Sequence, residues 1–70
     1  MIPEIPLQDR IRALRREIAY MQTHYPVWVK ARRITRQQAR DKLLTFARIL
    51  NDYETQDDRF WAQVVPEELE

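Results

Sequence analysis

Two pairs of neighbouring residues are the candidates for catalytic chemistry in this sequence of 70 residues. His24 and Tyr25 join two proton-carrying side chains, and Asp57 and Asp58 place two carboxylates side by side. A general base needs an orienting partner and a pocket, so we favour a histidine that interacts with the dipole of a helix C-terminus. Adjacent residues do not face each other on a helix, which favours a capping or surface role for the aspartates. No nucleophile, base and orienting residue can be assembled, and we expect no enzyme.

The sequence also lacks residues suited to binding a metal or a cofactor. The sequence has no cysteine, which excludes disulfides and thiolate zinc sites. His24 is the single histidine, and no carboxylate lies three or four residues from it. The absence of glycine argues against a phosphate-binding glycine loop. We therefore expect no metal and no cofactor, and the lack of cysteine agrees with a reducing cytoplasm.

Charge is divided unevenly along the chain, although the net charge is only +1. Residues 8–48 hold eleven arginines and lysines against three acids, whereas residues 49–70 hold one arginine and seven acids. The basic part could bind an anionic partner. Alternatively, the acidic part neutralises it, within one chain or across a dimer.

Seven basic residues are the candidates for partner binding, because they share helix faces or cluster between the predicted helices. They are Arg12, Arg16, Lys30, Arg32, Arg33, Arg36 and Arg40. In a nucleic-acid interface they would contact phosphates while Trp28 or Tyr25 stacked on a base. A solvated, partly paired helix surface is the favoured alternative, since helices commonly carry this much charge. A helix-turn-helix normally has a turn of three to four residues, and the predicted connector here has about ten.

An aromatic pair, Phe60 and Trp61, lies in the acidic C-terminal part. Such a pair could anchor a partner protein. We favour a lid over the hairpin or a dimer contact, because a chain of 70 residues needs the apolar area for its own core.

Apolar residues at alternating spacings of four and three predict the first helix, over about residues 6–24. They form a heptad seam typical of coiled coils and comprise Leu7, Ile11, Leu14, Ile18, Met21 and Tyr25. Pro26 cannot donate a backbone hydrogen bond and is expected to end this helix. Pro3 and Pro6 predict an extended arm over residues 1–6.

A capping box predicts the start of the second helix, because Gln38 follows Thr35 by three residues. We expect this helix over about residues 36–55. Its core seam is Ala39, Leu43, Phe46, Leu50 and Tyr53. Leu44, Ala47 and Ile49 widen the apolar face, which indicates contact with more than one neighbour. In the short helical connector, Trp28 is expected to plug the end of the core beside the connector.

The C-terminal part leaves alternatives open. Residues 56–65 either extend the second helix or form a separate segment that packs on the hairpin or on a second subunit. Residues 66–70 are expected to be a frayed acidic tail. No apolar run approaches the ~20 residues of a membrane span, and the first residues do not resemble a signal peptide, so no membrane association is expected.

These patterns predict one all-α domain over residues 1–70, an antiparallel two-helix hairpin with a short helical connector and a C-terminal aromatic segment. A chain this short buries only about 60% of its unfolded surface. Chains of this size usually need disulfides, a metal or a second copy. Since the first two are not supplied, we expect a homodimer to complete the core.

The centre of the chain resembles a group of small helical proteins encoded by bacteriophages and prophages, most of which have no assigned function. The resemblance rests on Tyr25-Pro26-x-Trp28-Val29-x-Ala31-x-Arg33-Ile34-Thr35, followed by Ala39 and a helix that ends near Asn51-Asp52-Tyr53. It covers about residues 10–53. Those proteins often have glycine where this chain has Arg32, and glycine suits a left-handed helix cap. Arginine there implies a strained residue, at a cost of about 1 kcal/mol, or a differently built turn.

The resemblance implies a phage accessory protein that acts in the cytoplasm of a bacterial host. Proteins of this kind commonly work by binding, and they occlude or redirect a host protein or attach to nucleic acid. We therefore expect an interaction protein that binds and modulates, for example inhibits, a host protein. Nucleic-acid binding through the same arginines is the alternative, and a structural role in the virion is a third.

Overall fold

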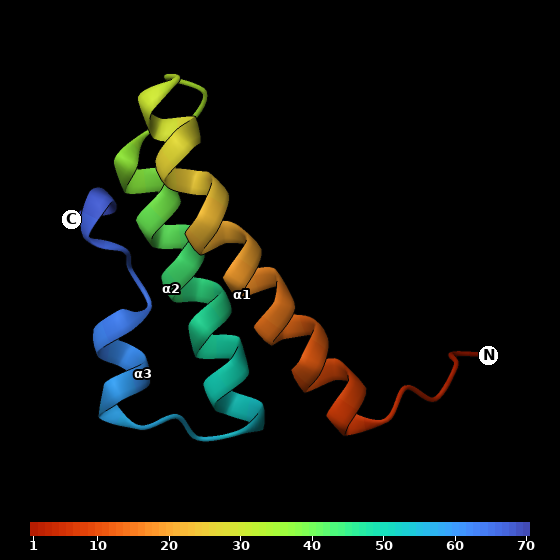
Figure 1. Cartoon of the computed structure of the whole chain (residues 1–70). Coiled ribbons are helices and arrows are strands. Elements are labelled where there is room, and N and C mark those ends of the chain that lie inside the picture. The colour runs from red at the N-terminus through yellow and green to blue at the C-terminus, as the bar shows by residue number, and fades with distance from the viewer.

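A computed structural model describes all 70 residues as three α-helices and one 3-10 turn (Figure 1). Helix α1 spans Leu7–Lys30, α2 spans Arg36–Tyr53, α3 spans Asp58–Gln63, and the 3-10 turn η1 spans Glu67–Leu69. Helices α1 and α2 run antiparallel, and the chain then turns back so that α3 lies alongside them. The prediction of an all-helical hairpin is confirmed. Residues 1–6 form an exposed, non-helical arm, as expected.

Helix α1 continues through Pro26, so the predicted end near residue 24 is wrong. Proline removes the hydrogen bond to the carbonyl four residues earlier, here that of Gln22, and strains the helix locally. Tertiary packing outweighs this local penalty, because Tyr25 before the proline is buried and Trp28 and Val29 after it pack against the core. The connector is consequently five residues long, 31–35, rather than about ten.

The end of α1 is a Schellman motif built without glycine. The backbone N–H of Arg33 donates to the Trp28 carbonyl at 2.9 Å, and that of Arg32 donates to the Val29 carbonyl at 3.0 Å. Arg32 has a φ of 60°, in the left-handed region. Of the two alternatives for this position, the strained arginine is therefore correct, and its cost is about 1 kcal/mol.

Helix α2 begins at the predicted capping box. The Gln38 N–H donates to the Thr35 hydroxyl at 3.0 Å, and the Thr35 N–H donates to the Gln38 side-chain carbonyl at 2.9 Å. The helix ends at Tyr53, two residues before the expected end.

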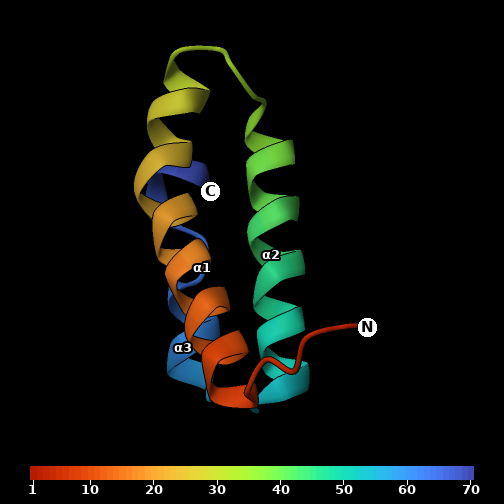
Figure 2. The same ribbon diagram turned by 90° about the vertical axis from the view of Figure 1, so that its right-hand side faces the viewer.

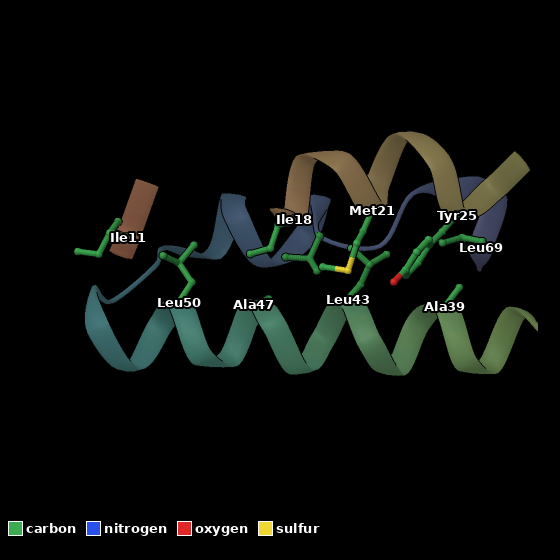
Figure 3. Close-up of a cluster of buried hydrophobic side chains, with 10 residues drawn as sticks. Ile11, Ile18, Met21, Tyr25, Ala39, Leu43, Ala47, Leu50 and Leu69 are labelled. Carbon is green, nitrogen blue, oxygen red and sulfur yellow. The ribbon is translucent and has the colours of Figure 1, made fainter. Parts of the chain in front are cut away.

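The core lies between α1 and α2 and is completed by the C-terminal segment, residues 54–70 (Figure 3). The buried residues are Ile11, Ile18, Met21, Tyr25, Ala39, Leu43, Ala47, Leu50, Val64 and Leu69. Leu14, Trp28 and Phe46 are only half-buried at its edge. Two predicted core residues are exposed, Leu7 by 43% and Tyr53 by 44%. Leu7 begins α1 where that helix slants away from α2 (Figure 1), and the Tyr53 ring instead faces the Arg10 guanidinium at 5.6 Å.

The C-terminal segment packs on the hairpin of its own chain. Residues 54–57 separate α3 from α2, so α3 is not an extension of it. Val64 and Leu69 are fully buried, and the half-buried Phe60 and Trp61 rest against the core. The expectation of a frayed tail over residues 66–70 is wrong, because burial of the Leu69 side chain among residues such as Tyr25 and Ala39 holds the last turn in place.

The two flanks of the hairpin differ in what lies on them. Figure 2 shows α3 behind the pair α1–α2, while the viewer's side carries only the N-terminal arm near the open end. On the covered flank, the Gln22 side-chain amide donates to the carbonyls of Gln63 and Val64 at 3.2 and 3.0 Å. Arg15 and Glu54 form an ion pair on the same side. The other side is the open flank, where Trp28, Phe46 and Ile49 are found.

Candidate binding surfaces

The seven predicted basic residues do not form one surface. Arg12 and Arg16 lie in the first half of α1, and Arg16 is 14 residues, or about 21 Å of helix, from Lys30. Arg12 is also paired with Asp9 at 3.2 Å. Arg40 is half-buried, and its Nε has no hydrogen-bond partner. The remaining four gather where α1 passes into α2.

We name these four, Lys30, Arg32, Arg33 and Arg36, the turn surface. Ion pairs join Arg12 to Asp9, Arg15 to Glu54 and Arg48 to Asp52, so no carboxylate neutralises the turn surface. The side chain of Val27, which is 60% exposed, lies one helical turn before Ala31 at the same end of the molecule. The turn surface is therefore a cationic patch at one end of the hairpin that forms no ion pair within the chain, and among the acids of residues 54–70 only Glu54 forms one, with Arg15.

A groove of about 730 Å³ adjoins the turn surface on the open flank, and we name it the open groove. The residues that line it are Tyr25, Trp28, Arg33, Ile34, Gln38, Asp41, Lys42, Thr45 and Phe46. Its apolar part is largely aromatic. Arg33 lies over the Trp28 ring at 5.3 Å from the ring centre, a cation–π distance. The Asp41 carboxylate accepts a hydrogen bond from the Gln37 amide at 2.8 Å.

The groove formed by residues of α2 was not predicted from the sequence, which had placed Phe46 in the core and Gln38 in the capping box. Gln38, Lys42 and Phe46 recur every four residues and therefore share one face of the helix. That face borders the buried line from Ala39 to Leu50. The periodic signal was visible, but only the packing of α1 shows that this border remains uncovered.

His24 and Tyr25 do not form a catalytic pair. His24 lies six residues before the end of α1, so the interpretation as a C-terminal histidine is wrong. Its ring packs on Tyr20 at 4.1 Å and lies 6.2 Å from Trp28. Tyr25 is turned into the core, where burial chiefly, with the nearby Glu17 and Tyr20 charges, raises the pKa of its phenol above 10.0. These positions explain both side chains by packing.

The other candidate pairs also have structural roles. Asp57 caps α3 by accepting a hydrogen bond from the Phe60 N–H at 2.9 Å, which confirms the capping prediction. Phe60 and Trp61 meet edge to face at 5.4 Å and pack against the core. Of the alternatives for these aromatics, the lid over the hairpin is the one that this arrangement supports, rather than an anchor for a partner.

No group of three or more histidines and carboxylates is arranged to hold a metal ion. None of the helices has the length and apolar character needed to cross a bilayer. Comparison with known proteins finds no matching family model, no similar curated protein and no similar solved structure.

Proposed function

We propose that this chain is a phage-encoded interaction protein that works as a homodimer and binds an acidic surface of a bacterial host protein. The turn surface is the contact site, and binding modulates the host protein in the cytoplasm. The observation that carries the proposal is the set of four cations without an ion-pair partner on a turn whose backbone is closed by a Schellman motif and a capping box. The bacterial partner follows from the resemblance to phage proteins.

Protein binding is favoured over nucleic-acid binding by the layout of the charges. A nucleic-acid groove usually presents a basic stripe that tracks successive phosphates. Here the cations of α1's first half are about 21 Å from the turn surface, and Arg12 and Arg15 are engaged with carboxylates. The four cations of the turn surface form a compact group beside an exposed apolar side chain, Val27, and this combination is suited to binding the surface of another protein.

The test is capture of a partner from bacterial lysate with the wild-type chain and with a charge-reversed variant. Arg32→Glu, Arg33→Glu and Arg36→Glu together are expected to weaken a stoichiometric complex about 100-fold, because attraction becomes repulsion. Arg12→Glu with Arg59→Glu is the control, since it reverses charges away from the turn. Equal capture by both variants, or no stoichiometric partner, would overturn the proposal.

Nucleic-acid binding stays as the second candidate, because the same four cations are unpaired and one of them, Arg33, lies over the Trp28 ring. It predicts binding to duplex DNA whose log affinity falls with log salt by about 0.9 for each phosphate contacted. Fluorescence anisotropy with a labelled duplex at several salt concentrations measures this slope. Absence of binding at low salt would eliminate this candidate.

A further inference from the structure

The N-terminal arm exposes a run of apolar side chains to solvent. Ile2 is 91% exposed and Ile5 is 53% exposed. Four of the nine large exposed apolar residues fall within residues 1–7, namely Met1, Ile2, Ile5 and Leu7. A short segment this apolar is expected to lie against another surface.

The backbone of the arm suits a particular kind of surface. Pro6 has φ −54° and ψ 144°, the polyproline II region, and Pro3 is fixed at a similar φ by its ring. Segments with two prolines separated by two residues dock into grooves lined by aromatic side chains, and their preformed conformation reduces the entropy lost on binding. Pro3 and Pro6 have this spacing.

The open groove has the matching chemistry. Tyr25, Trp28 and Phe46 provide the aromatic lining, and Arg33 and Lys42 provide positive charge at its border. The arm carries one charge besides that of its amino group, the carboxylate of Glu4. The groove's volume, about 730 Å³, is in the range of sites that take a few side chains.

Ile2 and Ile5 cannot reach the rings of Tyr25 and Trp28 in their own chain. From Leu7 to Tyr25 is 18 residues of helix, or about 27 Å. Ile2 lies five residues before Leu7, or about 16 Å in polyproline II conformation, so an arm folded back along α1 leaves both isoleucines short of these two rings. When two hairpins pack antiparallel, however, the open end of one lies beside the turn of the other, and the arm emerges next to the partner's groove.

We propose that two copies of this chain pack antiparallel through their open flanks and that each arm docks in the open groove of the other copy. The contact is isologous, so it occurs twice and closes the dimer. Ile2 and Ile5 lie on the aromatic lining, and Glu4 pairs with Lys42. The proposal rests on the homodimer in the proposed function and adds the mode of assembly. The turn surfaces then lie at opposite ends of the dimer.

We call this reciprocal docking of the two arms the arm exchange. Engineered cysteines test it directly, because the chain has no cysteine of its own. Ile5→Cys is mixed with Thr45→Cys, whose side chain lines the groove, under mild oxidation. The expected product is the mixed disulfide that joins one chain of each variant, at twice the 8.6 kDa chain mass. Ile5→Cys mixed with Ala62→Cys, on the exposed side of α3, is the control and should cross-link at least tenfold more slowly. Equal rates in the two mixtures would overturn the exchange.

Substitutions in the arm separate the mode of assembly from the homodimer itself. Ile2→Ser with Ile5→Ser is expected to raise the dimer dissociation constant, measured by light scattering, about 100-fold, since each of the two arms loses two buried apolar side chains. Leu44→Ser, at an exposed leucine of α2, is the matched control and should change it less than about threefold. Glu4→Lys should weaken the dimer, and adding Lys42→Glu should restore part of the loss.

Each outcome has a distinct meaning. Wild-type chain that stays at 8.6 kDa at micromolar concentration would overturn both the homodimer and the arm exchange. A dimer that the arm substitutions leave unchanged would overturn the arm exchange alone. Circular dichroism of each variant shows whether the helices persist, because the arm contributes nothing to the monomer's core.

Discussion

The covered and open flanks of the hairpin are built on the same two helices but have different roles. On the covered flank, Val64 and Leu69 are fully buried and the Gln22 amide holds the end of α3. On the open flank, Phe46 is half-buried and Ile49 remains exposed. The chain's own C-terminal segment therefore stabilises one flank, whereas the other flank is left uncovered and is the one that we propose for the contact between two copies.

The largest expected effect comes from Leu69 on the covered flank. Leu69→Ala should lower the free energy of unfolding by about 2 kcal/mol, at the small end of the range for buried leucines because the chain end can relax. Ile49→Ala on the open flank is the control and should change it by less than about 0.5 kcal/mol in the monomer. Urea denaturation followed by circular dichroism measures both. Equal losses would remove the distinction between the flanks.

Gln22 provides the second comparison. Gln22→Ala removes both hydrogen bonds to the Gln63 and Val64 carbonyls and should lower stability by about 1 kcal/mol. Faster amide exchange should appear in residues 58–69 ahead of the rest of the chain. Thr23→Ala, whose hydroxyl bonds only to the Ala19 carbonyl, is the neighbouring control. Uniform acceleration across α1 and α2 would show that the segment does not open by itself.

Replacing Arg32 by glycine should raise the free energy of unfolding instead of lowering it. Arg32→Gly should stabilise the chain by about 1 kcal/mol, because glycine adopts a φ of 60° without strain. Arg32→Ala, which keeps a Cβ, should not. The same pair of variants tests the turn surface, since both remove one cation and should weaken partner binding equally. A glycine variant less stable than the alanine variant would contradict the assignment of strain.

The smallest expected effect concerns the Arg15–Glu54 pair. The hydrogen bond from Arg15 holds the pKa of the Glu54 carboxyl below its ordinary value of 4.5. A depressed folded-state pKa contributes stability that is present above pH 4.5 and is lost as the pH falls through the folded value. Arg15→Gln should therefore lower Tm slightly at neutral pH, and this difference should shrink as the pH falls below 4.5. A difference that persists at acid pH would point to packing instead of charge.

Local chemistry made the start of α2 and the buried side of α1 predictable. Thr35 and Gln38 specify the start of α2 by themselves, and the heptad spacing of Ile11, Ile18 and Met21 specifies the buried side of α1. The preference for glycine in a left-handed cap correctly marked Arg32 as unusual.

The remaining features depend on contacts between distant residues. Proline ends most helices. Pro26 does not end α1, because residues on both sides of it pack against the core. Leu69 looked like part of a charged, frayed end, and only the site offered by the hairpin core makes it a buried residue. Arg16 is far from the turn surface because α1 continues to Lys30, whereas the predicted helix ended near residue 24.

The hydrogen bonding of the turn has a consequence for the kinetics of recognition. The backbone N–H groups of Arg32, Arg33, Thr35 and Gln38 all have partners within the turn. The four cations are thus displayed from a backbone that is already ordered before any partner arrives. Little backbone entropy therefore remains to be lost on association, and the encounter rate should be set by long-range charge attraction. That rate is expected to fall with ionic strength, while the dissociation rate stays nearly constant.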